Sequence, residues 1–157
     1  MNLFATLQQF VPQQQLSKVA GRLAASRHPY VKRAFIRSFA KAYNVSLDEY
    51  ERQSFNAYES FNDFFTRELK DDARLIDSRA NGIVSPADGV ISQLGQIRDH
   101  KLLQAKGRHY DIGQLLADSE DGSYFADGSF ATVYLAPSNY HRVHMPFAGT
   151  LTKTRYI

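Results

Sequence analysis

Residues 1–45 carry apolar residues at the spacing of a helix. Positions three and four apart share one side of an α-helix, so such a repeat indicates a buried stripe. The first stripe consists of Leu16, Val19, Ala20, Leu23 and Ala24. Pro12 separates this helix from a short segment at Leu3–Phe10, and Pro29 suits the first turn of a following helix. The pattern therefore predicts one helix on each side of Pro29.

The helix after Pro29 has two contrasting faces. Its apolar side holds Val31, Ala34, Phe35, Phe39 and Ala42. Its basic flank holds Arg33, Arg37 and Lys41 at four-residue spacing, with Lys32 in the same basic group. An interfacial helix needs an apolar face for the lipid boundary and a basic face for anionic head groups. We therefore expect these four basic residues to bind a membrane surface. The alternative is a helix whose stripe packs on the body of the protein while its charges are solvated.

The charge of the chain is unevenly distributed. The net charge is +3, yet seven of the 19 Lys and Arg residues precede Asp48, the first of the 16 acidic residues. A basic leader before a mildly acidic body indicates a polyanionic partner, either a membrane surface or a nucleic acid. Nucleic-acid binding is the weaker alternative because no reading motif is present. The 157 residues include no Cys, which excludes disulfides, thiolate zinc sites and a cysteine nucleophile.

The remainder of the chain changes from helical to strand-like texture. A capping-box pattern at Ser46–Glu49 predicts a helix around Leu47–Arg52. Ser60 begins another, with Phe61, Phe64, Phe65 and Leu69 on its buried side. From Gly82 onward, short strand-like runs alternate with turn residues. The runs are Ile83–Val84, Val90–Leu94, Leu102–Leu103, Phe130–Leu135 and Gly149–Ile157, with a short helix at Gly113–Ala117.

These elements predict an α+β protein with mostly antiparallel strands. We divide it into a helical, membrane-associating region at residues 1–45 and a β-rich catalytic domain at residues 46–157. The chain stops within its last predicted strand, so we expect the β body to be incomplete.

Two segments contain residues that can carry chemistry. Asp88 lies in a Pro-x-Asp-Gly sequence, which is typical of a turn between strands. His141 and His144 lie three residues apart in a loop bounded by prolines. The two histidines are compatible with a metal pair, with structural roles or with acid–base chemistry oriented by a carboxylate. The residues by themselves leave these alternatives open.

Four segments, in this order along the chain, resemble signatures of the phosphatidylserine decarboxylase family, of the membrane-associated bacterial type. Ser60–Arg67 resembles its FNxFFxR segment, Pro86–Ser92 and Leu103–Gly107 resemble its next two signatures, and Tyr140–Pro146 resembles its double-histidine loop. The resemblance runs from about Ser54 to Arg155. It implies a β-sandwich or barrel-like core behind the N-terminal helices.

The resemblance also implies a mechanism. Members of this family convert phosphatidylserine to phosphatidylethanolamine, and loss of carbon dioxide requires an electron sink. Their sink is a pyruvoyl group, made when the proenzyme cuts itself before a serine in a Leu-Gly-Ser-Thr motif. By motif position, Asp88 resembles the carboxylate that orients the base, and His144 the base that activates this serine. His141 resembles a second histidine that acts in decarboxylation.

This chain contains no Leu-Gly-Ser-Thr sequence. We therefore expect it to be the part before the self-cleavage site, inactive without the small pyruvoyl-bearing chain from the same proenzyme. The resemblance implies a peripheral location on the cytoplasmic face of the bacterial inner membrane and phosphatidylserine as the lipid partner. It is also compatible with a homodimer. The alternatives are a catalytically silent membrane-binding fragment or pseudoenzyme, and a metal-dependent hydrolase that uses His141 and His144.

Overall fold

The computed structural model describes residues 13–79, 81–104 and 108–156. The chain forms two compact units, Met1–Arg74 (unit 1) and Leu75–Ile157 (unit 2). The predicted Leu3–Phe10 segment lies outside the described residues. The boundary at Arg74 reflects packing, whereas the sequence division at residue 45 follows charge, and the membrane role of residues 1–45 stays a prediction.

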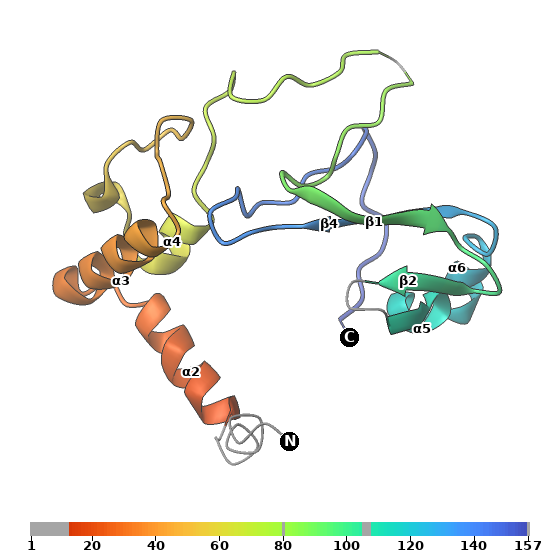
Figure 1. Ribbon diagram of the computed structural model, residues 1–157, viewed down its shortest axis with the longest axis horizontal. Helices are drawn as coiled ribbons and strands as arrows, with labels where there is room; N and C mark the ends of the chain where they lie inside the picture. Colours follow the sequence, from red (N-terminus) through yellow and green to blue (C-terminus); the bar gives the residue numbers. More distant parts are fainter. Residues whose placement is uncertain (1–12, 80, 105–107, 157) are drawn as a thin grey trace. The chain divides into compact units, whose positions relative to one another are not determined.

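Unit 1 begins with the two predicted helices, α2 (Gln13–Ala24) and α3 (Pro29–Ala42). The two helices are drawn in orange in Figure 1. Pro29 occupies the first turn of α3, where its fixed φ suits a helix and no backbone N–H is lost. The side chain of Ile36 is fully buried and that of Ala40 nearly so. This face fixes α3 within unit 1.

An aromatic cluster closes the core of unit 1. The ring of Phe39 on α3 lies 5.1 Å from Phe61, 6.1 Å from Phe64 and 5.8 Å from Phe65 between centroids, in edge-to-face geometry. These three rings come from α4 (Phe61–Phe65), which follows the short 3-10 helix η1 (Phe55–Ala57). The predicted start of α4 is confirmed, since the Ser60 side chain accepts a hydrogen bond of 3.1 Å from the Asp63 N–H.

A buried arginine completes this core. Arg67 is fully buried, and its guanidinium lies 4.3 Å from the ring centroid of Tyr50 and 5.2 Å from that of Phe64. Aromatic faces attract a cation, so these rings replace part of its hydration. The hydroxyl of buried Tyr58 donates to the Arg52 carbonyl at 2.7 Å. Burial raises the pKa of Tyr58.

The helix predicted around Leu47–Arg52 does not form. The Ser46 hydroxyl instead bonds with Asp48, accepting from its N–H at 3.1 Å and donating to its carboxylate at 2.6 Å. Tyr50 pairs with Leu69 in an antiparallel bridge, flanked by backbone bonds to Glu68 and Lys70. This pairing uses the backbone groups that a helix would need, so the capping pattern indicated the wrong element.

Unit 2 contains two antiparallel pairs of strands. Strand β1 (Val90–Gln96) pairs with β4 (Ser129–Tyr134), as Figure 1 shows, and a bulge interrupts their register between Ile91 and Gln93. Strand β2 (Lys101–Gln104) contains the predicted run Leu102–Leu103. It pairs with β3 (Arg108–Asp111), a strand that was not predicted. The α+β class and the antiparallel pairing are confirmed.

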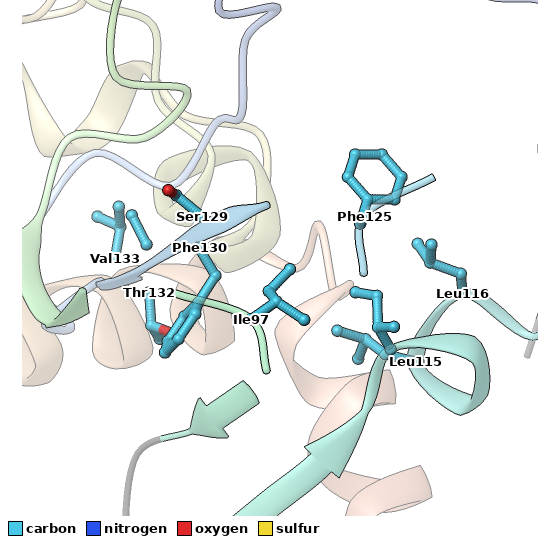
Figure 2. Close-up of a pocket in the computed structure, with 10 residues that line it drawn as sticks. Ile97, Leu115, Leu116, Phe125, Ser129, Phe130, Thr132 and Val133 are labelled. Carbon is cyan, nitrogen blue, oxygen red and sulfur yellow. The ribbon is translucent and has the colours of Figure 1, made fainter. Parts of the chain in front are cut away.

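Two short helices pack beside these strands. Helix α5 (Ile112–Leu116) confirms the prediction of a short helix at Gly113–Ala117, whereas α6 (Ser119–Ser123) was not predicted. A Cβ on Gly122 would lie 2.8 Å from the Cα of Gly113, so the two helices need glycine at their crossing. An apolar cavity of about 450 Å³ opens between α5 and β4. Figure 2 shows Ile97, Leu115 and Phe130 on its walls.

Two predicted strands of unit 2 are irregular. Ile83–Val84 forms no strand, although the Val84 N–H donates to the Pro146 carbonyl at 2.9 Å. Residues 149–156 are also irregular and are held by side chains instead of a backbone ladder. Arg155 forms ion pairs with Asp118 and with Asp121, the latter at 2.8 Å. A strand requires a partner strand, and none is paired with this segment within the described residues.

Candidate active site

The fold brings Asp88 beside the double-histidine loop. Asp88 and Tyr140 form an antiparallel bridge, and the His144 N–H donates to the Pro86 carbonyl at 2.8 Å. The bond from Val84 to Pro146 continues the pairing in the same direction. Residues 84–88 therefore run antiparallel to residues 140–146. All three candidate catalytic residues lie on these two segments.

Local bonds shape the segment that carries Asp88. The Ser85 hydroxyl donates to the Ala87 carbonyl at 2.7 Å, where the chain bends at Pro86 and Ala87. The turn between two strands that Pro-x-Asp-Gly predicts does not form, because Asp88 itself bridges to Tyr140. Gly89 then begins the approach to β1. A Cβ at this position would overlap the carbonyl oxygen of Tyr134, so only glycine allows β4 to pass this close. The half-buried Asp88 is thus fixed between a bend and a tight crossing.

A second turn positions His141. The Asn139 side chain accepts from the Ala136 N–H at 2.7 Å, while the Asn139 N–H donates to the Ala136 carbonyl at 2.9 Å. The Nε2 atom of His141 lies 3.1 Å from the same carbonyl. A carbonyl oxygen only accepts, so His141 carries a proton on Nε2. Its ring is therefore held by the backbone of its own loop.

His144 is held by Tyr140. The Tyr140 hydroxyl lies 2.7 Å from Nε2 of His144, and the two rings stack with centroids 5.5 Å apart. Tyr140 is only 6% exposed, whereas the His144 residue is exposed. Sequence reasoning assigned no role to Tyr140. The available signal was a large aromatic residue in the loop, immediately before the first histidine.

The apolar cavity is separate from these residues, because its lining comes from α5, β4, Ile97 and Phe125.

Among the residues that the structure describes, no group of three His, Asp or Glu side chains has the arrangement of a metal site. The two loop histidines have different partners, a carbonyl and a phenol. The chemistry open to this site is proton transfer at an exposed imidazole beside the segment that carries the Asp88 carboxylate.

The predicted membrane-binding residues divide into two groups. Arg33, Arg37 and Lys41 are exposed on α3. Lys32 is half-buried, and its Nζ donates to the Tyr58 carbonyl at 2.5 Å within unit 1. On the predicted apolar side of α3, Phe39 packs against α4 but Phe35 is exposed, and the fully buried residues are Ile36 and Ala40, which the stripe did not include. Helix α2 exposes its stripe, with Leu16 61% and Val19 51% exposed. None of the described helices is long and apolar enough to cross a bilayer.

A sequence model of the family described as phosphatidylserine decarboxylase matches residues 61–157, which include the whole double-histidine loop. The chain belongs to the phosphatidylserine decarboxylase family. A second model, described only as PSD, matches residues 3–44. Together the two matches cover both the basic leader and the site.

Named bacterial relatives agree with this assignment. The chain is 86% identical over 157 residues to a phosphatidylserine decarboxylase proenzyme of Psychrobacter cryohalolentis. It is 50% identical over 155 residues to the proenzyme of Acinetobacter baumannii. The match covers 100% and 99% of this chain but 57% and 55% of those relatives. The chain thus spans a little over half the length of the curated relatives it matches.

Proposed function

We propose that this chain, joined to the further length that its relatives possess, decarboxylates phosphatidylserine to phosphatidylethanolamine with a pyruvoyl group as electron sink. The observation that carries the proposal is the antiparallel pairing of residues 84–88 with residues 140–146. This pairing supports joint action of Asp88 and His144, which lie far apart in the sequence.

In the proposed self-cleavage, His144 acts as the general base. Its Nε2 takes the proton from the serine hydroxyl as that oxygen attacks the preceding carbonyl carbon. The C–N bond then breaks, the same proton passes to the departing amine nitrogen, and the upstream chain is left as an ester on the serine oxygen. Loss of the serine α-proton with elimination of that carboxylate cuts the chain, and water then replaces the nitrogen as ammonia to leave the ketone. Asp88 serves as the carboxylate that orients the imidazole and stabilises its charged form. His141, with Nε2 engaged by a carbonyl, acts in the later decarboxylation.

The side chains at this site fit the formation of a pyruvoyl group from the protein's own serine. Its formation requires an imidazole that another segment can reach and a carboxylate near it, and this site offers the exposed His144 beside the Asp88 segment. When present, the pyruvoyl group supplies an electrophilic carbonyl that accepts the electrons left by carbon dioxide. The residues of this chain hold the loop and move the protons.

The proposed protein partner is the pyruvoyl-bearing chain cut from the same proenzyme. Unit 2 exposes apolar side chains on β1, with Val90 66% and Leu94 71% exposed. Apolar surface of this extent favours a covering partner, because burial gains about 25 cal/mol per Å². A homodimer stays a prediction.

The proposed location is the cytoplasmic face of the bacterial inner membrane, reached through α2 and α3. The exposed stripe of α2 is the better candidate for the lipid boundary, because α3 uses Ile36, Phe39 and Ala40 for packing within unit 1. Arg33, Arg37 and Lys41 remain available to anionic head groups, each worth about 1 kcal/mol near such a surface.

The catalytic proposal is tested in the full-length proenzyme. We expect purified proenzyme to split into two chains and to release carbon dioxide from phosphatidylserine vesicles. His144→Ala and Asp88→Asn should each block the split, whereas His141→Ala should permit it and abolish decarboxylation. A proenzyme that stays uncut, or a His144→Ala variant that cuts at the normal rate, would overturn the assignment.

The membrane proposal is tested by sedimentation with vesicles of anionic and zwitterionic lipid. Replacing Arg33, Arg37 and Lys41 by Gln should weaken binding to anionic vesicles, more at low salt than at high salt. Lys32→Gln is the matched control, since its Nζ is bonded inside unit 1 and should affect binding less. Replacing Leu16, Val19 and Leu23 by Ser should reduce binding at every salt concentration. Unchanged binding by both triple variants would contradict the proposal.

A further inference from the structure

The contact between Tyr140 and His144 has a mechanistic consequence because Nε2 of an imidazole offers a single in-plane lone pair. The Tyr140 hydroxyl lies 2.7 Å from that atom. In the proposed self-cleavage, the same lone pair must accept the serine proton. The phenol and the serine hydroxyl therefore compete for one position.

The direction of this hydrogen bond follows from the acidities of the two groups. A phenol O–H is a better donor than the N–H of a neutral imidazole, so the Tyr140 hydroxyl donates and Nε2 accepts. The ring proton of His144 then lies on Nδ1, because the bond made by one ring nitrogen sets the tautomer. This tautomer is the one that a base acting through Nε2 requires.

The Tyr140 ring has little freedom to leave. Its side chain is buried, its backbone bridges to Asp88, and its ring stacks on that of His144 with an interplanar angle of 16°. The exposed His144 has more room to move than the buried tyrosine ring. The bond is thus broken by movement of the imidazole or rotation of the phenol O–H, and not by displacement of the tyrosine ring.

From this geometry we infer that Tyr140 is a positioning residue with two opposing effects. Its ring stacks on that of His144 while its backbone bridges to Asp88, and its hydroxyl reserves Nε2 until the nucleophilic serine displaces it. A hydrogen bond present only in the resting state lowers the energy of that state and leaves the transition state unchanged. The hydroxyl therefore slows self-cleavage while the ring supports it. The inference rests on the proposed function.

The first test removes the hydroxyl and keeps the ring. Tyr140→Phe in the full-length proenzyme should accelerate self-cleavage by roughly 2- to 10-fold, the factor equivalent to one ordinary hydrogen bond. Tyr124→Phe, at a tyrosine that is 82% exposed, is the matched control and should leave the rate unchanged. An unchanged or slower rate for Tyr140→Phe overturns the inference. If the unmodified proenzyme does not cut at all, the proposed function itself has failed.

The second test reads the tautomer directly and does not depend on cleavage. The 157-residue chain is labelled with ¹⁵N-histidine, and the His144 signals are identified with a His144→Gln variant. Spectra are recorded near pH 8, above the ordinary histidine pKa of about 6.5. We expect Nε2 of His144 to give an acceptor-type shift, and Tyr140→Phe to raise the fraction protonated at Nε2. Identical ring shifts in the two proteins would overturn the inference.

Discussion

The two units of this chain use their apolar residues in opposite ways. In unit 1, Ile36, Tyr58 and Phe64 are fully buried. In unit 2, Ile97 and Ile112 form a small core with Leu116 and Phe130, while large side chains on β1 face outward. Unit 1 closes its core with its own residues, whereas unit 2 has strand faces that its described residues leave uncovered.

The difference follows from how each type of element buries side chains. The rings of unit 1 lie close together in sequence, between Phe35 and Phe65, and two short helical segments bring them against α3. A two-stranded sheet has two faces and is marginal without a covering layer. The β1–β4 pair can therefore have correct register and still expose its apolar side chains. Unit 1 should behave as a stable body, and unit 2 as one that gains stability from additional chain.

The largest expected effect that tests this contrast is removal of the central ring of unit 1. Phe64→Ala should lower the free energy of unfolding of unit 1 by about 3–5 kcal/mol, because it leaves a cavity among edge-to-face rings. Hydrogen exchange at each amide, recorded for the whole chain at increasing urea concentrations, measures this loss separately for the two units.

The matched substitution in unit 2 is Leu94→Ala. Leu94 is 71% exposed, so the expected change in this chain is within about 0.5 kcal/mol. In the full-length proenzyme the same substitution should become costly, by about 2 kcal/mol or more, if the partner chain covers β1. A large loss from Leu94→Ala in the 157-residue chain would show that the proposed difference between the units is false.

The fold of unit 1 was largely predictable because its signals are local. The helix spacing around Phe39, Pro29 at a first turn and the Ser60 cap each act within one or two turns. The prediction at Ser46 was wrong because a longer-range pairing of Tyr50 with Leu69 took the backbone groups. Local pattern does not reveal such competition.

An intermediate loss of stability is expected from a substitution at Gly89, because β4 passes very close to this residue. A Cβ on this residue would overlap the Tyr134 carbonyl, so Gly89→Ala must move β4 or the Asp88 turn. We expect destabilisation of unit 2 by about 1–3 kcal/mol and faster exchange of the His144 amide, which is bonded to the Pro86 carbonyl. Gly21→Ala is the control, since a Cβ there meets open space. If both variants behave alike, the close approach of β4 to Gly89 does not constrain unit 2.

The candidate site was predictable only in part. Asp88, His141 and His144 were chosen by resemblance, and their proximity depends on backbone pairing between segments that local patterns cannot connect. The role of Tyr140 was missed because hydroxyl contacts require three-dimensional geometry. Residues 149–156 illustrate the same limit, since their sequence predicted a strand although ion pairs hold them instead.

The smallest expected effect concerns those ion pairs. Asp118 caps α6 and also forms ion pairs with Arg155 and Lys153. The pKa of Asp118 is lowered, most strongly by the hydrogen bond from the Asp121 N–H and further by the other donors and cations around it. A carboxyl group whose pKa is lower in the folded state stabilises that state at all pH values above its unfolded pKa of about 3.9. This contribution is lost as the pH falls below that value and through the folded pKa. Acidification below about pH 3.9 should therefore lower the protection factor of the Asp121 amide, that is, its exchange rate relative to the slower intrinsic rate at the same pH.

Asp118→Asn separates the two roles of this residue, because an amide oxygen can still cap the helix but cannot pair with cations. The variant should keep much of the protection of α6 and lose its response to acid in this range. High salt should weaken the pairs with Arg155 and Lys153 while leaving the N-cap bonds in place. Equal acid sensitivity in the Asp118→Asn variant and the unmodified protein would mean that the charge of this residue does not hold residues 153–155. Other contacts within unit 2 would then hold that segment. Unit 2 would in that case be more stable by itself, and closer to unit 1, than the exposed strand faces of unit 2 indicate.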